Sequence, residues 1–234
     1  MKKHKTGILA TALAFGLTAS PAMAAVDLFD WAFYVDGTAY ESGGGYPGAP
    51  LSAIAGMNDS GFDWTSGLGT LTWSTSVAGS HTFLAFFDLE IDEADNTYFN
   101  EYGAAHGSTA AGQSWEIDEP GYLFGDIYDN LLAGSLDNSN GVPVGLPDDV
   151  SFALGWDFTL GVGETATIVL NLTNAAPQAG FFLSQTDPDS DESVYFSSTL
   201  RTSGEPIPEP ATMLLMGTGL AGLFGVGRKR MKKA

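Results

Sequence analysis

The chain has 234 residues, with 28 acidic side chains, nine basic side chains, no cysteine and a formal net charge of −19. Arg201 is the only Lys or Arg between residues 6 and 227. Without its two ends, the body therefore carries a net charge of about −27. Direct binding to nucleic acid through a basic surface is excluded, and adhesion to an anionic membrane surface is disfavoured, because both need clusters of Lys and Arg. The absence of cysteine excludes disulfides, thiolate catalysis and metal sites built on Cys.

Residues 1–24 are typical of a secretory signal peptide. Three lysines precede an apolar run over residues 7–17, and the small residues Ala22 and Ala24 come just before Ala25. This order predicts an N-terminal signal helix that signal peptidase removes by cutting after Ala24. We therefore expect the secretion machinery to export the chain.

The C-terminal 29 residues are arranged in three parts. A Pro-rich linker at 206–210 contains Pro208, Glu209 and Pro210, an uncharged stretch covers 211–227, and a basic tail covers 228–234. At a rise of about 1.5 Å per residue the uncharged stretch would span roughly 25 Å, which predicts a single transmembrane helix. The basic tail should keep its end cytoplasmic and leave the acidic body outside.

Pro208-Glu209-Pro210, the Gly- and Leu-rich stretch and the basic tail together resemble the PEP-CTERM sorting signal of Gram-negative bacteria that make exopolysaccharide. The resemblance implies that a membrane-embedded exosortase recognises these three residues and cuts near them. The body would be anchored transiently in the inner membrane and then released to the cell surface or to an extracellular, biofilm-type matrix. The body from Asp63 onward also resembles an ectodomain that recurs in PEP-CTERM proteins, which implies no particular activity.

The body, residues 25–205, is predicted to be all-β. Apolar and polar residues alternate over 150–160 and 165–172, and a Gly-rich turn at 161–164 separates the two runs, which predicts a β-hairpin. Many short strands with Gly-rich turns favour an antiparallel β-sandwich of jelly-roll type. Further strands are expected at 28–35, 69–75, 81–90, 179–185 and 194–201.

Carboxylates are concentrated in two segments, with six between residues 88 and 101 and four between 187 and 192. Dense Asp and Glu segments supply the oxygen ligands that Ca²⁺ prefers, although a solvated acidic loop is the simpler alternative. Alternate residues of a strand lie about 6.6 Å apart, so we expect the chain to turn wherever several of them bind one ion. The candidate calcium ligands are Asp88, Glu90, Asp92, Asp95, Asp187, Asp189 and Asp191.

The function predicted from the sequence is that of a non-enzymatic protein of the cell surface or extracellular matrix, stabilised by Ca²⁺. One alternative is a module that binds exopolysaccharide by stacking sugar rings on aromatic side chains, for which Tyr98, Tyr102 and Trp115 are the candidates. A second is a glycoside hydrolase with a pair of catalytic carboxylates. His81 and His106 are expected to be surface side chains.

Overall fold

The computed structural model describes residues 25–42, 53–91, 97–121 and 124–204. The predicted signal peptide, linker, transmembrane helix and basic tail therefore lie outside the described residues. Ala25 is the first described residue, and it is exposed. Within the described part of the chain, no helix is long and apolar enough to cross a membrane.

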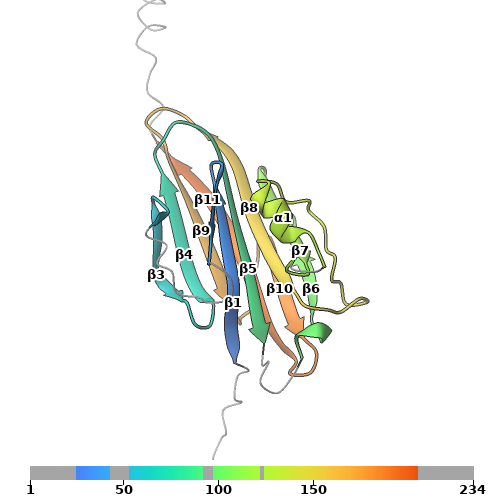
Figure 1. Cartoon of the computed structure of the whole chain (residues 1–234). Coiled ribbons are helices and arrows are strands. Elements are labelled where there is room, and N and C mark those ends of the chain that lie inside the picture. Colours follow the sequence, from blue (N-terminus) through green and yellow to red (C-terminus); the bar gives the residue numbers. More distant parts are fainter. Residues whose placement is uncertain (1–24, 43–52, 92–96, 122–123, 205–234) are drawn as a thin grey trace, which may run out of the picture.

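Two antiparallel sheets form a sandwich (Figure 1), which confirms the predicted all-β sandwich. The five-stranded sheet has the order β2 (Thr38–Glu41), β1 (Val26–Val35), β5 (Gly79–Ile91), β8 (Ser151–Leu160) and β7 (Gln113–Asp118). The six-stranded sheet has the order β3 (Met57–Asp63), β4 (Leu68–Thr75), β9 (Thr165–Thr173), β11 (Glu192–Ser203), β10 (Phe182–Asp187) and β6 (Tyr102–His106). A 3₁₀ turn, η2 (Tyr98–Asn100), precedes β6, and one helix, α1 (Ile127–Leu132), lies between β7 and β8.

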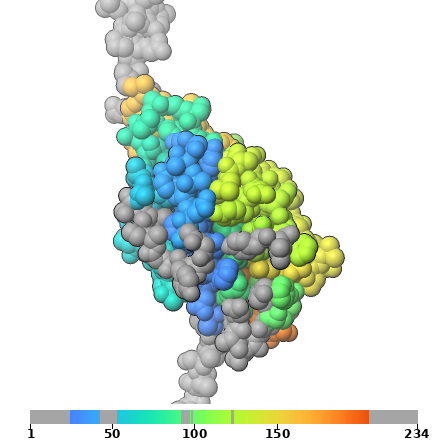
Figure 2. All heavy atoms as spheres, in the orientation of Figure 1, coloured from blue at the N-terminus to red at the C-terminus, as the bar shows by residue number. Residues whose placement is uncertain are grey.

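The central strand β5 is buried on both of its faces. Phe83, Phe87 and the other inward residues belong to the main core between the two sheets. Phe86 faces the opposite way, and it is covered by Ile127 and Leu131 of α1. Figure 2 shows the segment that contains α1, in lime, covering the sheet beside β1 and β2, in blue. The outer face of the five-stranded sheet is therefore a second interior in which side chains can be screened from water.

The predicted hairpin between residues 150–160 and 165–172 is wrong. Both strands form, but β8 pairs with β5 and β7, whereas β9 pairs with β4 and β11 in the other sheet. The turn at 161–164 therefore leads from one sheet to the other. Alternation requires each strand to bury one apolar face, and two strands satisfy this equally well by facing each other across a core or by pairing edge to edge.

His81 is buried, contrary to the expectation that it lies on the surface. Its Nδ1 lies 2.8 Å from Oδ2 of Asp36, and its Nε2 lies 2.7 Å from the backbone oxygen of Val77. Both partner atoms are acceptors, so the ring can donate to both of them when it is protonated. The ring joins the β1–β2 turn to the β4–β5 turn, and it stacks on Phe158 with ring centroids 5.2 Å apart.

We expect the contacts of His81 to make stability depend on pH. Burial lowers the pKa of His81, but the hydrogen bonds to Asp36 and Val77 and the charge of Asp36 outweigh it, so the pKa is raised above 6.5. The stabilisation is therefore fully present below about pH 6.5 and is lost as pH rises through the folded-state pKa. The measurement is thermal unfolding of the wild type and His81→Gln between pH 5.5 and 9. The gap in unfolding free energy between them should narrow at alkaline pH, and a constant gap would contradict the assignment.

Candidate metal centre

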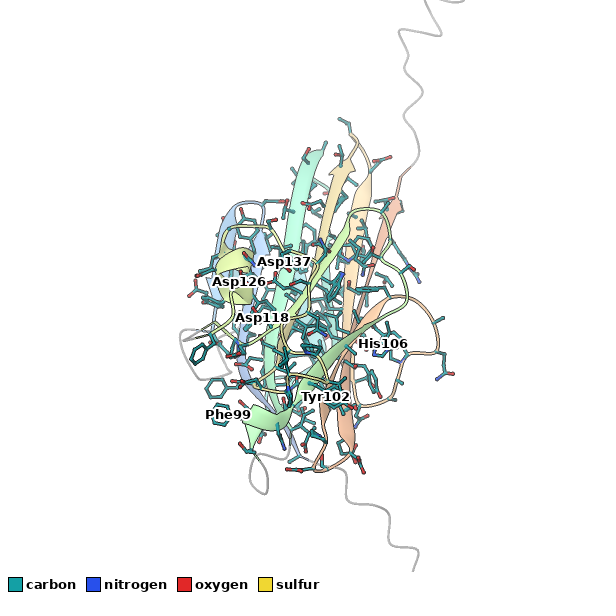
Figure 3. All side chains as sticks on the ribbon, turned by 90° about the vertical axis from the view of Figure 1, so that its right-hand side faces the viewer. Phe99, Tyr102, His106, Asp118, Asp126 and Asp137 are labelled. Carbon is teal, nitrogen blue, oxygen red and sulfur yellow. The ribbon has the colours of Figure 1, made fainter. Side chains whose placement is uncertain are left out.

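Carboxylates line one row across the outer face of the five-stranded sheet. The strand register places Asp30 of β1 opposite Asp88 of β5, Asp88 opposite Ser151 of β8, and Ser151 opposite Asp118 of β7. Adjacent strands lie about 4.8 Å apart, so the row spans roughly 15 Å. Figure 3 shows Asp118 and Asp126 on the side of the molecule that carries α1. Pairing thus gathers acidic residues that are far apart in the chain.

Four carboxylates form what we call the buried acidic cluster, namely Asp88, Glu90, Glu101 and Asp149. Asp88 and Glu90 project from the same face of β5, Glu101 follows η2, and Asp149 precedes β8. The backbone N–H of Asp148 donates to the carbonyl of Glu101 at 3.0 Å, which holds the last two segments together. Carboxylate oxygens of Asp88, Glu90 and Asp149 all lie within 4.8 Å of one another.

Several oxygens at this cluster are sealed from water and accept no hydrogen bond from the described residues. Asp88 and Glu101 are each 1% exposed, and the unpartnered atoms are Oδ1 of Asp88 and Oε1 of Glu101. Gln185 reaches the cluster from β10 in the other sheet, and its Nε2 donates to Oε2 of Glu101 and to the carbonyl of Leu89. The Oε1 of Gln185 is also buried without a donor. A buried oxygen without a hydrogen-bond donor or a cation beside it destabilises the folded state.

The carboxylates of the buried acidic cluster also repel one another. Burial raises the pKa of Asp88 well above its usual value, and the charges of Asp149, Glu90, Asp30 and Glu101 raise it further. Burial, with the charges of Glu90 and Asp149, raises the pKa of Glu101 to about 9. Arg201, the one Lys or Arg among the described residues, is on β11 in the other sheet. The cluster must therefore take up protons or a cation.

The carboxylate oxygens of the cluster lie close enough together for one calcium ion to contact several of them. Ca²⁺ binds oxygen at about 2.3–2.6 Å, so ligands on opposite sides of one ion are roughly 4.6–5.2 Å apart. The carboxylate oxygens of Asp88, Glu90 and Asp149 all lie within 4.8 Å of one another, so one ion of this size can contact all three. Asp88, Glu90 and Asp149 could hold it directly, and Glu101 and Gln185 lie beside them.

The structure joins only some of the candidate ligands predicted from the sequence. Asp88 and Glu90 belong to the cluster, whereas Asp92 and Asp95 lie outside the described residues. Asp88 and Glu90 are alternate residues of β5, and their side chains approach each other although the chain does not turn between them. Asp149 and Gln185 were missed. The Asp148-Asp149 pair directly before a predicted strand was a usable signal for the first of them, and nothing in the local sequence marks the second.

The second predicted cluster, at residues 187–192, lies in the turn between β10 and β11. Backbone N–H groups of this turn donate hydrogen bonds to the carboxylate of Asp187. Both oxygens of Asp187 accept backbone hydrogen bonds, from Asp189 at 2.9 Å and from Ser190 at 3.0 Å. Asp189 accepts a hydrogen bond from Asn100, and Asp191 is exposed with a positive φ of 60°. The described residues do not bring these three side chains together as a group of ligand oxygens.

Two of the predicted sugar-stacking residues, Trp115 and Tyr102, do not face the same surface. Trp115 is half-buried against the main core and contacts Phe181, with ring centroids 5.9 Å apart. A Cβ atom on Gly103 would meet Ile117, so Gly103 faces inward, and its neighbour Tyr102 faces outward from β6. Figure 3 shows Tyr102 well away from the acidic residues near α1. Tyr98 begins η2, but its side chain lies outside the description.

A second acidic group, formed by Glu116, Asp118 and Asp126, holds the segment around α1 in place. Their oxygens also lie within 4.8 Å of one another. Both oxygens of the buried Glu116 are used, because Nδ2 of Asn130 donates at 2.8 Å and the backbone N–H of Asp137 donates at 3.1 Å. The backbone N–H of Asp126 donates to Asp118 at 2.8 Å. We therefore interpret this group as a structural tie.

Glu116→Gln should flatten the pH dependence of stability. Burial raises the pKa of Glu116 from 4.5 to about 7, although the hydrogen bonds from Asn130 and Asp137 oppose the shift. Stability should fall as pH rises from 4.5 to 7, because the folded state loses protons that the unfolded state has already lost. Chemical denaturation at several pH values should show a smaller slope for Glu116→Gln than for the wild type. The exposed Asp129→Asn is the control, and equal slopes for Glu116→Gln and wild type would refute the assignment.

Comparison with known proteins identifies a motif near the C-terminal end of the chain. No curated protein and no solved structure matches the chain. Residues 206–230 match the family described as the PEP-CTERM protein-sorting motif, which confirms the resemblance carried by Pro208, Glu209 and Pro210. The chain therefore carries a PEP-CTERM sorting signal, which supports an exported protein that an exosortase processes at the membrane.

Proposed function

We propose that this chain is a non-enzymatic protein of the cell surface or extracellular matrix, and that Ca²⁺ stabilises its acidic body at the buried acidic cluster. The observation that carries the calcium proposal is the convergence of Asp88, Glu90 and Asp149 oxygens within 4.8 Å. The unpartnered buried oxygens of Glu101 and Gln185 beside them support it independently. The ion would be structural, because it would offset the free-energy cost of burying these mutually repelling carboxylates.

The burial of the cluster favours a structural role over a catalytic one. A glycoside hydrolase needs two carboxylates that reach a bound sugar from either side. Asp88 and Glu101 are each only 1% exposed, so neither offers an oxygen to a substrate. Carboxylates with raised pKa values also occur in active sites, but here the cause is enclosure between packed segments.

A bound ion would join parts of the chain that are distant in sequence. Asp88 and Glu90 come from the middle of the five-stranded sheet, and Asp149 comes from the segment that enters β8. Gln185 already links β10 to β5 through the carbonyl of Leu89. Calcium at this position would replace mutual repulsion by attraction where the two sheets and the segment around α1 meet.

Calcium should raise the thermal stability of residues 25–204 well beyond the effect of ionic strength. At a concentration about 100 times the dissociation constant, binding contributes roughly 2.7 kcal/mol, or about 5–10 °C in Tm for a body of this size. Asp88→Asn should raise Tm in EDTA, since it removes one repelling charge, and should abolish most of the calcium gain. Differential scanning calorimetry in EDTA, in Ca²⁺ and in matched NaCl measures both effects.

Two further variants make this calcium test specific. Asp129→Asn removes the same charge from the exposed side of α1 and should retain the full calcium gain. Asp149→Asn tests the site from its half-buried side if Asp88→Asn folds poorly. Equal Tm shifts from Ca²⁺ and NaCl in the wild type, or an unchanged calcium gain in both cluster variants, would disprove the site.

Replacement of Pro208, Glu209 and Pro210 by alanine should block processing by the exosortase. The uncut chain should accumulate in the inner-membrane fraction at its higher mass, whereas the wild type should appear outside the cell or on its surface. Cell fractionation with immunoblotting measures the distribution. Alanine at Thr202 and Ser203, exposed residues just before the matched segment, is the control. Normal release of the triple variant would contradict this assignment.

A further inference from the structure

The last strand of the sandwich leads directly into the sorting motif. β11 stays paired with β9 as far as Ser203. A Cβ atom on Gly204, the next residue, would lie 2.8 Å from Cα of Glu164 and 3.1 Å from the backbone oxygen of Gly163. The chain is therefore held against the β8–β9 turn up to Gly204, and the matched motif begins only two residues later, at residue 206.

This short connection limits the distance between the sorting motif and the folded body. Four residues of fully extended chain span at most about 14 Å, so Pro208 lies within that distance of Gly204. Even a domain of about 100 residues has a radius of gyration of about 13 Å. An enzyme that binds Pro208, Glu209 and Pro210 must therefore lie against the end of the body where β11 finishes.

Two turns form this end of the body. The β4–β5 turn covers residues 76–78, and the β8–β9 turn covers residues 161–164. β9, which begins directly after the second turn, pairs with β4 up to Thr75, and β8 ends opposite Gly79, the first residue of β5. Figure 1 shows both connections together at the top of the view. We call these two turns the exit end.

Each turn of the exit end presents a valine to solvent. Val77 is 66% exposed and Val162 is 75% exposed. Hydrogen bonds hold both turns in place, because Nε2 of His81 lies 2.7 Å from the backbone oxygen of Val77 and the N–H of Gly161 donates to Oε2 of Glu164 at 2.6 Å. Apolar side chains displayed in this way gain free energy when a partner covers them.

The exit end also lacks the dense negative charge of the rest of the body. The β4–β5 turn has no Asp or Glu, and neither do β4 and β9. Glu164 is the one acidic residue of the β8–β9 turn, and Asp36 in the β1–β2 turn is paired with His81. An enzyme embedded in an anionic membrane therefore meets less electrostatic repulsion at this end than at the faces that carry the acidic groups.

We propose that the exit end is a docking surface for the exosortase, which covers Val77 and Val162 while it binds Pro208, Glu209 and Pro210. The proposal rests on processing at the sorting motif. The motif and the exit end act as two parts of one ligand, since binding of the first holds the second at a high effective concentration. The lipid bilayer is a poorer occupant, because the two turns carry no Lys or Arg to bind anionic lipid.

The rate of processing in the full chain tests this surface. Val77→Asp combined with Val162→Asp should slow conversion of the precursor at least about tenfold, because the contact loses its apolar surface and would bury two charges. Pulse-chase labelling measures the half-time. The matched control is Val144→Asp with Leu146→Asp, which are 71% and 68% exposed on the loop that leads to the buried acidic cluster. It should be processed at the wild-type rate, and circular dichroism checks that both variants fold.

A longer connection separates docking from effects on folding or export. Ten Gly and Ser residues inserted after Gly204 lower the effective concentration of the exit end. The lengthened wild type should slow toward the rate of the Val77 and Val162 variant, and the same substitutions should then change the rate by less than about twofold. A persistent tenfold difference in the lengthened chain would overturn the proposal, because the substitutions would act elsewhere than on docking.

Cleavage by exosortase purified in detergent distinguishes the enzyme from the membrane. The dependence on Val77 and Val162 should persist there, and a dependence that appears only with lipid vesicles would identify the bilayer as the occupant and refute the proposal. Equal rates for the double variant and the wild type in the unmodified chain would also refute it. A wild type that is not processed at all would instead contradict the sorting assignment, on which the docking surface depends.

Discussion

Repulsion between carboxylates in a nearly cation-free body is the constraint that the rest of this structure must satisfy. Asp88 and Glu101 lie side by side with Glu90 and Asp149, enclosed by packed segments. Folding therefore concentrates negative charge where water cannot screen it. A protein could avoid this cost with apolar residues of similar size, and their absence at this point favours a site built for a cation.

The sandwich creates this site by burying both faces of β5. The inward face supplies the main core, and the outward face carries Leu84 and Phe86 under α1 before it reaches Asp88 and Glu90. Glu116 and Asp118 fasten the covering segment through its backbone and through Asn130. The segment around α1 thus covers Leu84 and Phe86, and it also screens Glu116 from water.

Charge is segregated at two levels, along the chain and across the fold. Along the chain, basic residues occupy the two ends, the C-terminal of which carries the sorting motif, and acidic residues occupy the body. Across the fold, every strand of the five-stranded sheet carries at least one carboxylate, whereas β4 and β9 of the six-stranded sheet carry none. This second separation leaves Arg201 as a cation on a neutral surface of a strongly acidic protein.

The amino-acid sequence by itself determined the sorting signal and the position of most strands. Pro208-Glu209-Pro210 can be recognised as a linear motif, and alternation over residues 150–160 and 165–172 depends only on neighbours in the chain. Only the tertiary structure decided that β8 and β9 belong to different sheets, since alternation does not specify a strand's partner. It alone brought Asp149 and Glu101 to Asp88 and Gln185 to Glu101, and it buried His81 between Asp36 and Val77. These contacts join residues that are distant in the chain, and no local pattern encodes which of them meet.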